Sequence, residues 1–167
     1  HCTFLEVRDE VVHDLLGKGI NLRVRESAGN GVYVPDATRR LVEWEEDVMR
    51  ALVLGLQKRS ALREAHDGGT AHAIFSISCV RKNSDGTSST STLTVVDLGS
   101  AEMRRPSSTR PGARDTGSAA LSALERCVTA LAEAAPLGTK PPALNEPNPH
   151  AIPYRESKLT WLLRDAL

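Results

Sequence analysis

Two strand-forming runs around a short polar turn constrain the fold of this chain more than any other feature. The first run, Ala71 to Val80, places apolar residues at roughly alternate positions, and the second, Thr92 to Val96, is rich in β-branched residues. Between them, Asn83-Ser84-Asp85-Gly86-Thr87 is typical of a tight turn. We therefore predict that the runs pair as antiparallel neighbours and that the second leads directly into Asp97.

Helices are predicted before and after this hairpin. Residues 43–65 begin with acidic side chains and are followed by Gly68-Gly69 as a stop signal, residues 116–135 carry one apolar face, and a last helix follows Pro153. Strands alternating with helices predict an α/β domain. The apolar faces expected on the three helices are Val48, Leu52 and Leu56; Leu121, Leu124, Val128 and Leu131; and Leu159, Leu162, Leu163 and Leu167.

The first 34 residues predict a strand and a second hairpin. Residues 2–7 form a strand-like run, and residues 11–16 then place apolar side chains at near-helical spacing. Residues 22–25 and 31–34 flank Ala28-Gly29-Asn30, which predicts a hairpin, the alternative being a loop with two extended edges.

Composition excludes some classes of partner. The chain has 21 basic and 21 acidic residues, so no overall field favours nucleic acid or a membrane surface. Its three cysteines, Cys2, Cys79 and Cys127, are far apart, which favours free thiols in a reducing compartment. No apolar run approaches the roughly 20 residues that span a bilayer. We expect a cytoplasmic protein, and a chain that begins at His1 without a signal-peptide layout suggests an excised segment.

Two segments are predicted to be loops. Residues 103–114 carry Arg104, Arg105, Arg110 and Arg114 without an acidic residue and form a basic loop. Residues 135–150 contain five prolines, which exclude a helix or a central strand. We expect an extended loop over residues 136–149.

Several motifs follow one another in the order found in one protein family. Residues 153–160 read PYRESKLT, residues 97–102 read DLGSAE, residues 72–77 read HAIFSI, and residues 4–16 read FLEVRDEVVHDLL. They resemble, respectively, the PYR(D/E)SKLT motif, the DLAGSE switch II, the strand after switch I, and the FxEIYNExxxDLL segment of kinesin motor domains. The resemblance covers essentially the whole chain.

This resemblance implies a P-loop NTPase-type α/β fold with a mixed central sheet and helices on both faces. Residues 1–167 would be a partial motor domain, downstream of the phosphate-binding loop. No Gly-x-x-x-x-Gly-Lys-Ser/Thr string occurs in residues 1–167, and its place in the family lies before His1. The resemblance further implies ATP and Mg²⁺ as cofactors, microtubules as the partner and the cytoskeleton as the location.

The nucleotide-sensing residues implied by the resemblance are altered. Two catalytic roles carry over in switch II: Asp97 would hold Mg²⁺ through water, and Glu102 would pair with a switch I arginine. The arginine position is occupied by Thr70, a Mg²⁺-facing serine by Gly69, and the γ-phosphate-sensing glycine by Ser100. The nucleotide-binding positions are Gly68, Gly69, Thr70, Gly99 and Ser100, and no direct metal ligand is assigned among them.

These substitutions favour weak or absent ATP hydrolysis. A threonine hydroxyl cannot replace a bidentate guanidinium. Groups that act as a unit in a transition state fail together when several are lost. A working motor with its P-loop elsewhere and a catalytically silent scaffold remain alternatives. Taken without the resemblance, Asp97 could be a strand-end cap, His72 a packed histidine and Glu102 a solvated charge.

A basic surface would bind the acidic face of tubulin. The resemblance assigns this role to Arg155 and Lys158, and Arg104, Arg105, Arg110 and Arg114 would add charge nearby. Trp161 stands where the family is often basic. The alternative interpretation of these charges is a solvated helix face.

Overall fold

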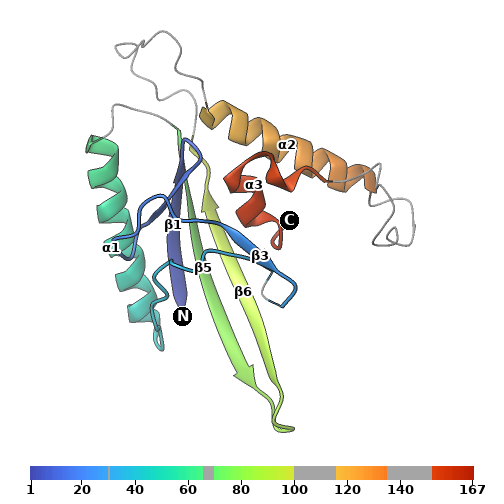
Figure 1. Ribbon diagram of the computed structural model, residues 1–167. Coiled ribbons are helices and arrows are strands. Elements are labelled where there is room, and N and C mark those ends of the chain that lie inside the picture. The colour runs from blue at the N-terminus through green and yellow to red at the C-terminus, as the bar shows by residue number, and fades with distance from the viewer. Residues whose placement is uncertain (30, 66–69, 100–115, 135–151) are drawn as a thin grey trace.

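The chain builds one antiparallel sheet with helices beside it, together with a separate hairpin (Figure 1). The computed structural model describes residues 1–29, 31–65, 70–99, 116–134 and 152–167. The sheet has the strand order β2-β1-β5-β6, and each neighbouring pair is antiparallel. Its strands are β1 Cys2–Arg8, β2 Val11–Asp14, β5 Ala71–Lys82 and β6 Ser88–Asp97. The separate hairpin consists of β3 Arg25–Ser27 and β4 Gly31–Tyr33.

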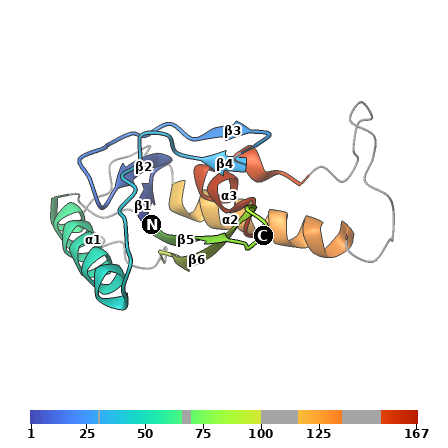
Figure 2. The same ribbon diagram turned by 90° about the horizontal axis from the view of Figure 1, so that it is seen from below.

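Helices cover both faces of the sheet, which confirms the predicted α/β arrangement (Figures 1 and 2). The helices are α1 Glu45–Ala65 on one face, and α2 Thr116–Ala134 and α3 Lys158–Leu163 on the other. Successive residues of a strand point to opposite faces, so neighbours in β1 enter different cores. Phe4 packs with Ala51 of α1 and Phe75 of β5, whereas Leu5 packs with Leu159 of α3.

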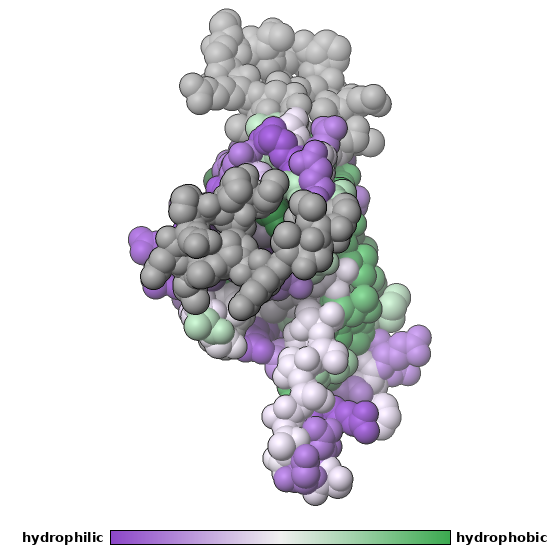
Figure 3. All heavy atoms as spheres, turned by 90° about the vertical axis from the view of Figure 1, so that its right-hand side faces the viewer, coloured by the Kyte–Doolittle hydropathy of each residue, from purple (hydrophilic) through white to green (hydrophobic). Residues whose placement is uncertain are grey.

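The hairpin predicted around Asn83 to Thr87 is confirmed. Lys82 pairs with Ser88, and Gly86 has a φ of +83°, a conformation that glycine adopts without strain. Every residue from Cys79 to Leu93 is exposed. This arm projects beyond the helices in Figure 1, and its tip is mostly hydrophilic in Figure 3.

The near-helical spacing of apolar residues within 11–16 does not correspond to a helix. Val11–Asp14 instead folds back as β2 against β1, with Arg8 opposite Val11. The turn consists of Asp9 and Glu10, whose φ angles are 50° and 60°. Two-residue hairpin turns of this kind usually contain glycine or asparagine. The sequence therefore lacked the usual signal.

The β3–β4 hairpin is present, as expected, and it lies against the end of the chain. Arg25 pairs with Tyr33, so the alternative of a loop with two extended edges is wrong. The Val32 amide donates to Oδ2 of Asp165 at 2.8 Å. Gly31 lies beside the same carboxylate with a φ of +62°, and a Cβ there would collide with it. The hairpin is thereby attached to the segment that follows α3.

Local hydrogen bonds explain why the SKLT residues begin a helix. A single 3₁₀ turn, η3 Tyr154–Glu156, leads into α3. Ser157 and Thr160 then form a reciprocal capping box, in which the Thr160 amide donates to the Ser157 hydroxyl at 3.1 Å. The Thr160 hydroxyl also donates to the Tyr154 carbonyl at 2.7 Å. The Lys158 amide at the first helical position donates to the Glu10 carboxylate at 2.7 Å.

The helix faces are partly as predicted. Val48, Leu52 and Leu124 pack against the two cores, but the most deeply buried positions of α1 and α2 are small residues and Arg59, and the small residues allow the helices to approach the sheet closely. Leu56, Val128 and Leu167 are exposed, whereas Leu159 and Leu163 are buried as predicted. The buried residues of α1 are Ala51, Gly55 and Arg59, and those of α2 include Ala120, Ala123 and Cys127.

Some predicted features cannot be compared with the structure. The basic loop 103–114 and the proline-rich loop 136–149 lie outside the described residues. Within the described ranges, no helix has the length and apolar character required to cross a membrane.

Candidate functional site

The beginning of β5 and the end of β6 lie side by side because the two strands are antiparallel. Ala73 pairs with Asp97 in the ladder. Thr70, which is buried, immediately precedes β5, and Gly99 follows β6. The structure therefore brings together three of the predicted switch positions, Thr70, Asp97 and Gly99.

Gly99 lies against the backbone of β5. A Cβ on this residue would stand 2.4 Å from the Ala71 carbonyl oxygen, so only glycine fits this close approach. The Gly99 amide donates to Nδ1 of His72 at 3.2 Å. Since Nδ1 accepts this bond, the neutral ring carries its proton on Nε2. These contacts fix the chain just after Asp97.

Arg59 of α1 connects the Asp97 carboxylate to the interior. Its Nη1 donates to Oδ2 of Asp97 at 2.5 Å, and its Nη2 donates to the Ala71 carbonyl at 3.2 Å. The arginine side chain is 9% exposed and that of Asp97 is 68% exposed. The carboxylate assigned to Mg²⁺ by the resemblance is thus held by a buried guanidinium.

The same arginine is anchored by a buried glutamate. Glu6 of β1 is fully buried, and its two carboxylate oxygens pair with Arg59 at 3.3 Å and with Arg8 at 3.1 Å. A buried carboxylate is tolerated only when charged partners and hydrogen bonds compensate its lost hydration. Arg8, Glu6, Arg59 and Asp97 form a charge-balanced row of two cations and two anions, which we call the arginine–carboxylate row.

His72 is neutral beside this row. Burial lowers its pKa below the ordinary 6.5, the positive charge of Arg59 lowers it further, and Asp97 acts in the opposite direction. Nε2 of His72 has no hydrogen-bond partner among the described residues. The ring therefore acts as a packed acceptor for the Gly99 amide, in agreement with the plainer of the two interpretations of this residue.

The described residues do not by themselves fit Mg²⁺ and ATP. Mg²⁺ takes six oxygen ligands in near-octahedral geometry. Within the described ranges, no group of three histidine, cysteine, aspartate or glutamate side chains could hold a metal ion. Asp97 supplies one carboxylate, and one of its oxygens is engaged by Arg59. Gly68, Gly69, Ser100 and Glu102 lie outside the described residues.

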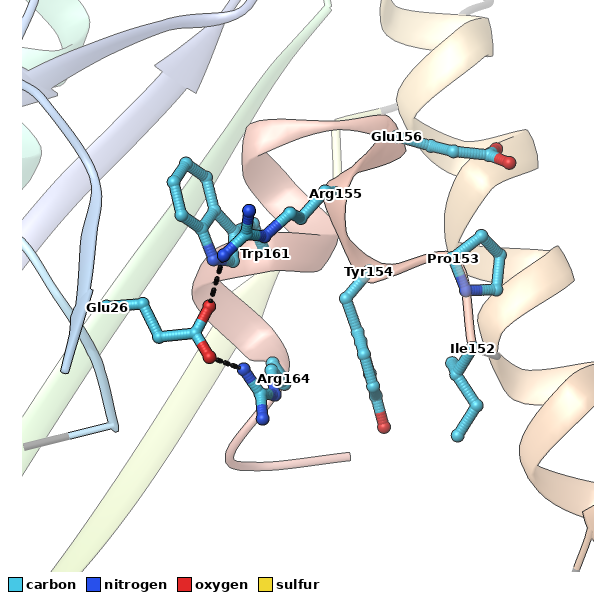
Figure 4. A pocket seen from close by; sticks show the side chains of 8 residues that line it. All are labelled: Glu26, Ile152, Pro153, Tyr154, Arg155, Glu156, Trp161 and Arg164. Carbon is cyan, nitrogen blue, oxygen red and sulfur yellow. Dashed lines mark hydrogen bonds and ion pairs between the residues drawn. The ribbon is translucent and has the colours of Figure 1, made fainter. Parts of the chain in front are cut away.

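A second cluster surrounds Arg155, one of the residues predicted to bind tubulin (Figure 4). Its Nη2 donates to the Glu26 carboxylate of β3 at 2.8 Å, and Arg164 donates to the other oxygen of the same carboxylate. The Arg155 guanidinium lies 5.1 Å from the centre of the Trp161 ring, and that of Arg164 lies 5.9 Å from the Tyr154 ring.

This cluster lines a surface pocket of about 540 Å³ between the hairpin and the chain around α3. In Figure 4, Glu26 extends from the hairpin towards the two arginines, whereas Glu156 points away from these arginines, towards α2. Glu156 pairs with Arg126 of α2. The lining residues are Glu26, Ile152, Pro153, Tyr154, Arg155, Glu156, Trp161 and Arg164.

The other basic residues predicted to bind tubulin are less informative. Lys158 is half-buried at the start of α3. Arg104, Arg105, Arg110 and Arg114 lie outside the described residues. Two of the predicted contacts, Arg155 and Lys158, are therefore placed at the same end of α3.

Sequence reasoning missed five residues of these clusters: Glu6, Arg8, Arg59, Glu26 and Arg164. Glu6 offered a signal, because an acidic residue stands within an otherwise apolar strand. Arg59 offered a weaker signal. It lies three positions after Leu56 and seven after Leu52, so it continues the predicted apolar face of the helix with a charged residue. Glu26 and Arg164 are ordinary charged residues in sequence, and only the tertiary fold brings them together.

The comparison with protein families identifies the lineage. The model for the kinesin motor domain matches residues 1–167. The chain belongs to the kinesin motor domain family. The motifs that suggested this resemblance therefore led to the correct family.

Individual kinesins resemble the chain along nearly its whole length. Kinesin-related protein 5 of Dictyostelium discoideum is 32% identical over 170 residues, which are 99% of this chain and 16% of that protein. Kinesin-like protein KIN-12B of Arabidopsis thaliana is 32% identical over 179 residues, 99% of this chain and 13% of that protein. The chain therefore spans less than a fifth of either relative.

A solved structure shows the same fold. It is described as a fast kinesin, with implications for its ATPase mechanism and interactions with microtubules. Its TM-score to this chain is 0.73 at 27% sequence identity, and the match covers 99% of this chain and 45% of that one. The chain thus has the fold of part of a kinesin motor, a P-loop NTPase-type domain.

Proposed function

We propose that this chain is a microtubule-binding segment of a kinesin motor in which ATP hydrolysis is weak or lost. The observation that supports weak or lost hydrolysis is Thr70, a buried threonine directly before β5. A kinesin resemblance places an arginine there, paired with the switch II glutamate. A short hydroxyl side chain cannot make the bidentate, charge-assisted contact of a guanidinium.

The pairing of Asp97 with Arg59 supports the same conclusion. The Asp97 carboxylate would hold Mg²⁺ through water when nucleotide is bound, while Arg59 competes for one of its oxygens. ATP and Mg²⁺ remain the cofactors that we propose for the whole protein, with the phosphates held by residues outside this chain. Weak occupancy of this site would leave attachment to the microtubule insensitive to nucleotide.

Microtubule binding is proposed for the surface that carries Arg155 and Lys158. Tubulin is acidic, and complementary charge accelerates and orients association. The basic residues of 104–114 would extend this surface. A protein with this activity is expected on the cytoskeleton, in the cytoplasm.

Two measurements on the full-length protein test the proposal. Co-sedimentation with microtubules is expected in ADP and in a non-hydrolysable ATP analogue alike, with little microtubule-stimulated ATPase activity. Thr70→Arg is expected to raise that activity, while Thr70→Val, which keeps the size of the side chain, is not. A wild-type ATPase strongly stimulated by microtubules would refute the loss of hydrolysis, and no pelleting in either nucleotide would refute the binding function.

A catalytically silent scaffold is the second candidate function. One observation favours it: Glu26 of the same chain already pairs with Arg155, so tubulin would have to displace this carboxylate to bind the arginine. Absence of pelleting together with a stable interaction with another protein would support the scaffold.

A further inference from the structure

We propose that Arg155 and Arg164 form a carboxylate-binding pair, that Glu26 is its intramolecular occupant, and that a glutamate side chain on an acidic protein surface binds the same pair by displacing Glu26. The inference rests on the proposed function, in which that acidic surface is tubulin. It adds that Glu26 competes with tubulin for Arg155 and Arg164.

The geometry is that of a carboxylate held from two sides. One oxygen of Glu26 accepts from Arg155 and the other accepts from Arg164 (Figure 4). The two arginines come from opposite ends of α3, since Arg155 lies in the preceding 3₁₀ turn and Arg164 follows Leu163. Two guanidinium groups on separate oxygens recognise any carboxylate of similar reach.

The two guanidinium groups have supports that do not depend on Glu26. Arg155 lies over the ring of Trp161 and Arg164 over that of Tyr154. Such cation–π contacts favour one orientation of each cation. The pair therefore keeps its arrangement when Glu26 leaves, which is what a second carboxylate requires.

Glu26 can leave at little cost. The side chains of Arg155, Arg164 and Glu26 are 71%, 40% and 26% exposed, so water reaches both ion pairs and weakens them. The β3–β4 hairpin keeps a separate attachment through the Val32 amide and Asp165. Release of Glu26 therefore does not require the hairpin to detach.

Protonation of Glu26 does not release it from the two arginines at physiological pH. Arg155 and Arg164 lower the pKa of Glu26 from 4.5 to about 2, so the carboxylate stays ionised at any physiological pH. Competition is then controlled by the concentration of the acidic partner and by salt, which screens exposed charges.

Glu26→Gln in the full-length protein tests the proposal, with Glu156→Gln as the matched control. Both substitutions remove one negative charge from the lining of the same pocket, but Glu156 pairs with Arg126 instead. We expect Glu26→Gln to tighten binding to microtubules by about threefold to fivefold, and Glu156→Gln to do so by less than about twofold. With a fluorescent decaglutamate peptide as the probe, Glu26→Gln is likewise expected to tighten binding more than Glu156→Gln does.

A double-mutant cycle separates displacement from a uniform charge effect. In an Arg155→Ala, Arg164→Ala background, Glu26→Gln is expected to have no more effect than Glu156→Gln. Equal tightening by the two glutamine variants overturns the proposal, and so does a Glu26 effect that persists without the arginines. Failure of both wild type and Glu26→Gln to bind either probe also overturns it.

Failure of the proposed function gives a different result. If wild type does not pellet with microtubules but Glu26→Gln still tightens peptide binding, tubulin is not the partner and the carboxylate-binding pair stands. If wild type does pellet but Glu26→Gln has no specific effect, the microtubule function stands and the competitor does not.

Discussion

Arg59 joins helix α1 to three strands of the sheet. Its partners are Glu6 of β1, the Ala71 carbonyl of β5 and Asp97 at the end of β6. Because Glu6 is fully buried, this arginine supports the fold as well as the candidate nucleotide site. Its loss should therefore appear in stability measurements even when no nucleotide is present.

Arg59→Leu is expected to destabilise the protein by about 3 kcal/mol, because Glu6 would keep only Arg8 as a buried partner. Denaturant unfolding of the full-length protein would measure the loss. Arg50→Ala is the control, since Arg50 also pairs with an aspartate on α1 but is 67% exposed, and its cost should stay within about 1 kcal/mol. Equal effects of the two substitutions would contradict the role of the arginine–carboxylate row.

His72 makes stability depend on pH in a defined direction. Its pKa is lowered in the folded state by burial and then by Arg59, so protonation favours the unfolded chain. The stabilisation is complete above the ordinary value of 6.5 and is lost as the pH falls below it. Unfolding at pH 7.5 and 5.5 should show this decrease, and His72→Asn, which keeps an acceptor for Gly99, should reduce it. An unchanged pH dependence in the variant would refute the assignment.

Single residues of the site were only partly predictable. Asp97, Thr70 and Gly99 were found because each lies within a contiguous motif. Glu6 and Arg59 are 53 positions apart, and their pairing follows from the packing of α1 on β1, which no local pattern specifies.

Among the structural elements, α1 shows how small residues set the distance between a helix and a sheet. Gly55 faces the ring of Phe4 in β1, and the helix buries Ala51 one turn earlier. Glycine is unfavourable inside a helix, so its presence here reflects the close approach and not helix propensity.

Gly55→Ala is expected to destabilise the protein by about 1–3 kcal/mol, because a Cβ there would overlap the Phe4 ring. Helix propensity alone predicts the opposite sign, a gain of about 1 kcal/mol. Thermal unfolding distinguishes the two outcomes. Ser60→Ala, at an exposed position of the same helix, should be neutral or slightly stabilising. A stabilised Gly55→Ala protein would show that the ring can move away.

Hairpins with conventional turns were the most predictable elements. Asp85-Gly86 and Ala28-Gly29-Asn30 marked two of them correctly. The β1–β2 hairpin escaped because Asp9 and Glu10 adopt positive φ angles without glycine. Helix positions were predicted well and their buried faces only in part, because the pattern of large apolar residues does not reveal the alanine and glycine positions that contact the sheet.

For the whole molecule, β6 forms an edge of the sheet in the part of the chain that the structure describes. Leu93 and Val95 on this strand are more than half exposed. The fast kinesin structure is covered by this chain over only 45% of its length. Apolar side chains on an unpaired edge strand promote association between chains.

The 167-residue chain by itself is therefore expected to aggregate on heating without a cooperative transition. Calorimetry and light scattering at several protein concentrations would measure this behaviour. Val95→Lys, which places a charge on the exposed strand, should reduce the scattering. A cooperative transition independent of concentration would contradict the prediction.

The family could be predicted at this scale because several motifs occur in one order along the chain. That order does not reveal which charged residues engage one another, since Glu26 and Arg164 are 138 positions apart. The sequence therefore supports the lineage, whereas the competition at Arg155 depends on the folded structure.

The hydrogen bond between Glu10 and the Lys158 amide joins residues 148 positions apart. At about 5–20 residues per second, a ribosome takes roughly 7–30 s to add the residues between them. Throughout that interval the β1–β2 hairpin of the nascent chain lacks this contact. The Glu10 carboxylate therefore waits for the start of α3, and slow translation of the residues between them would prolong the time during which other chains can reach this hairpin.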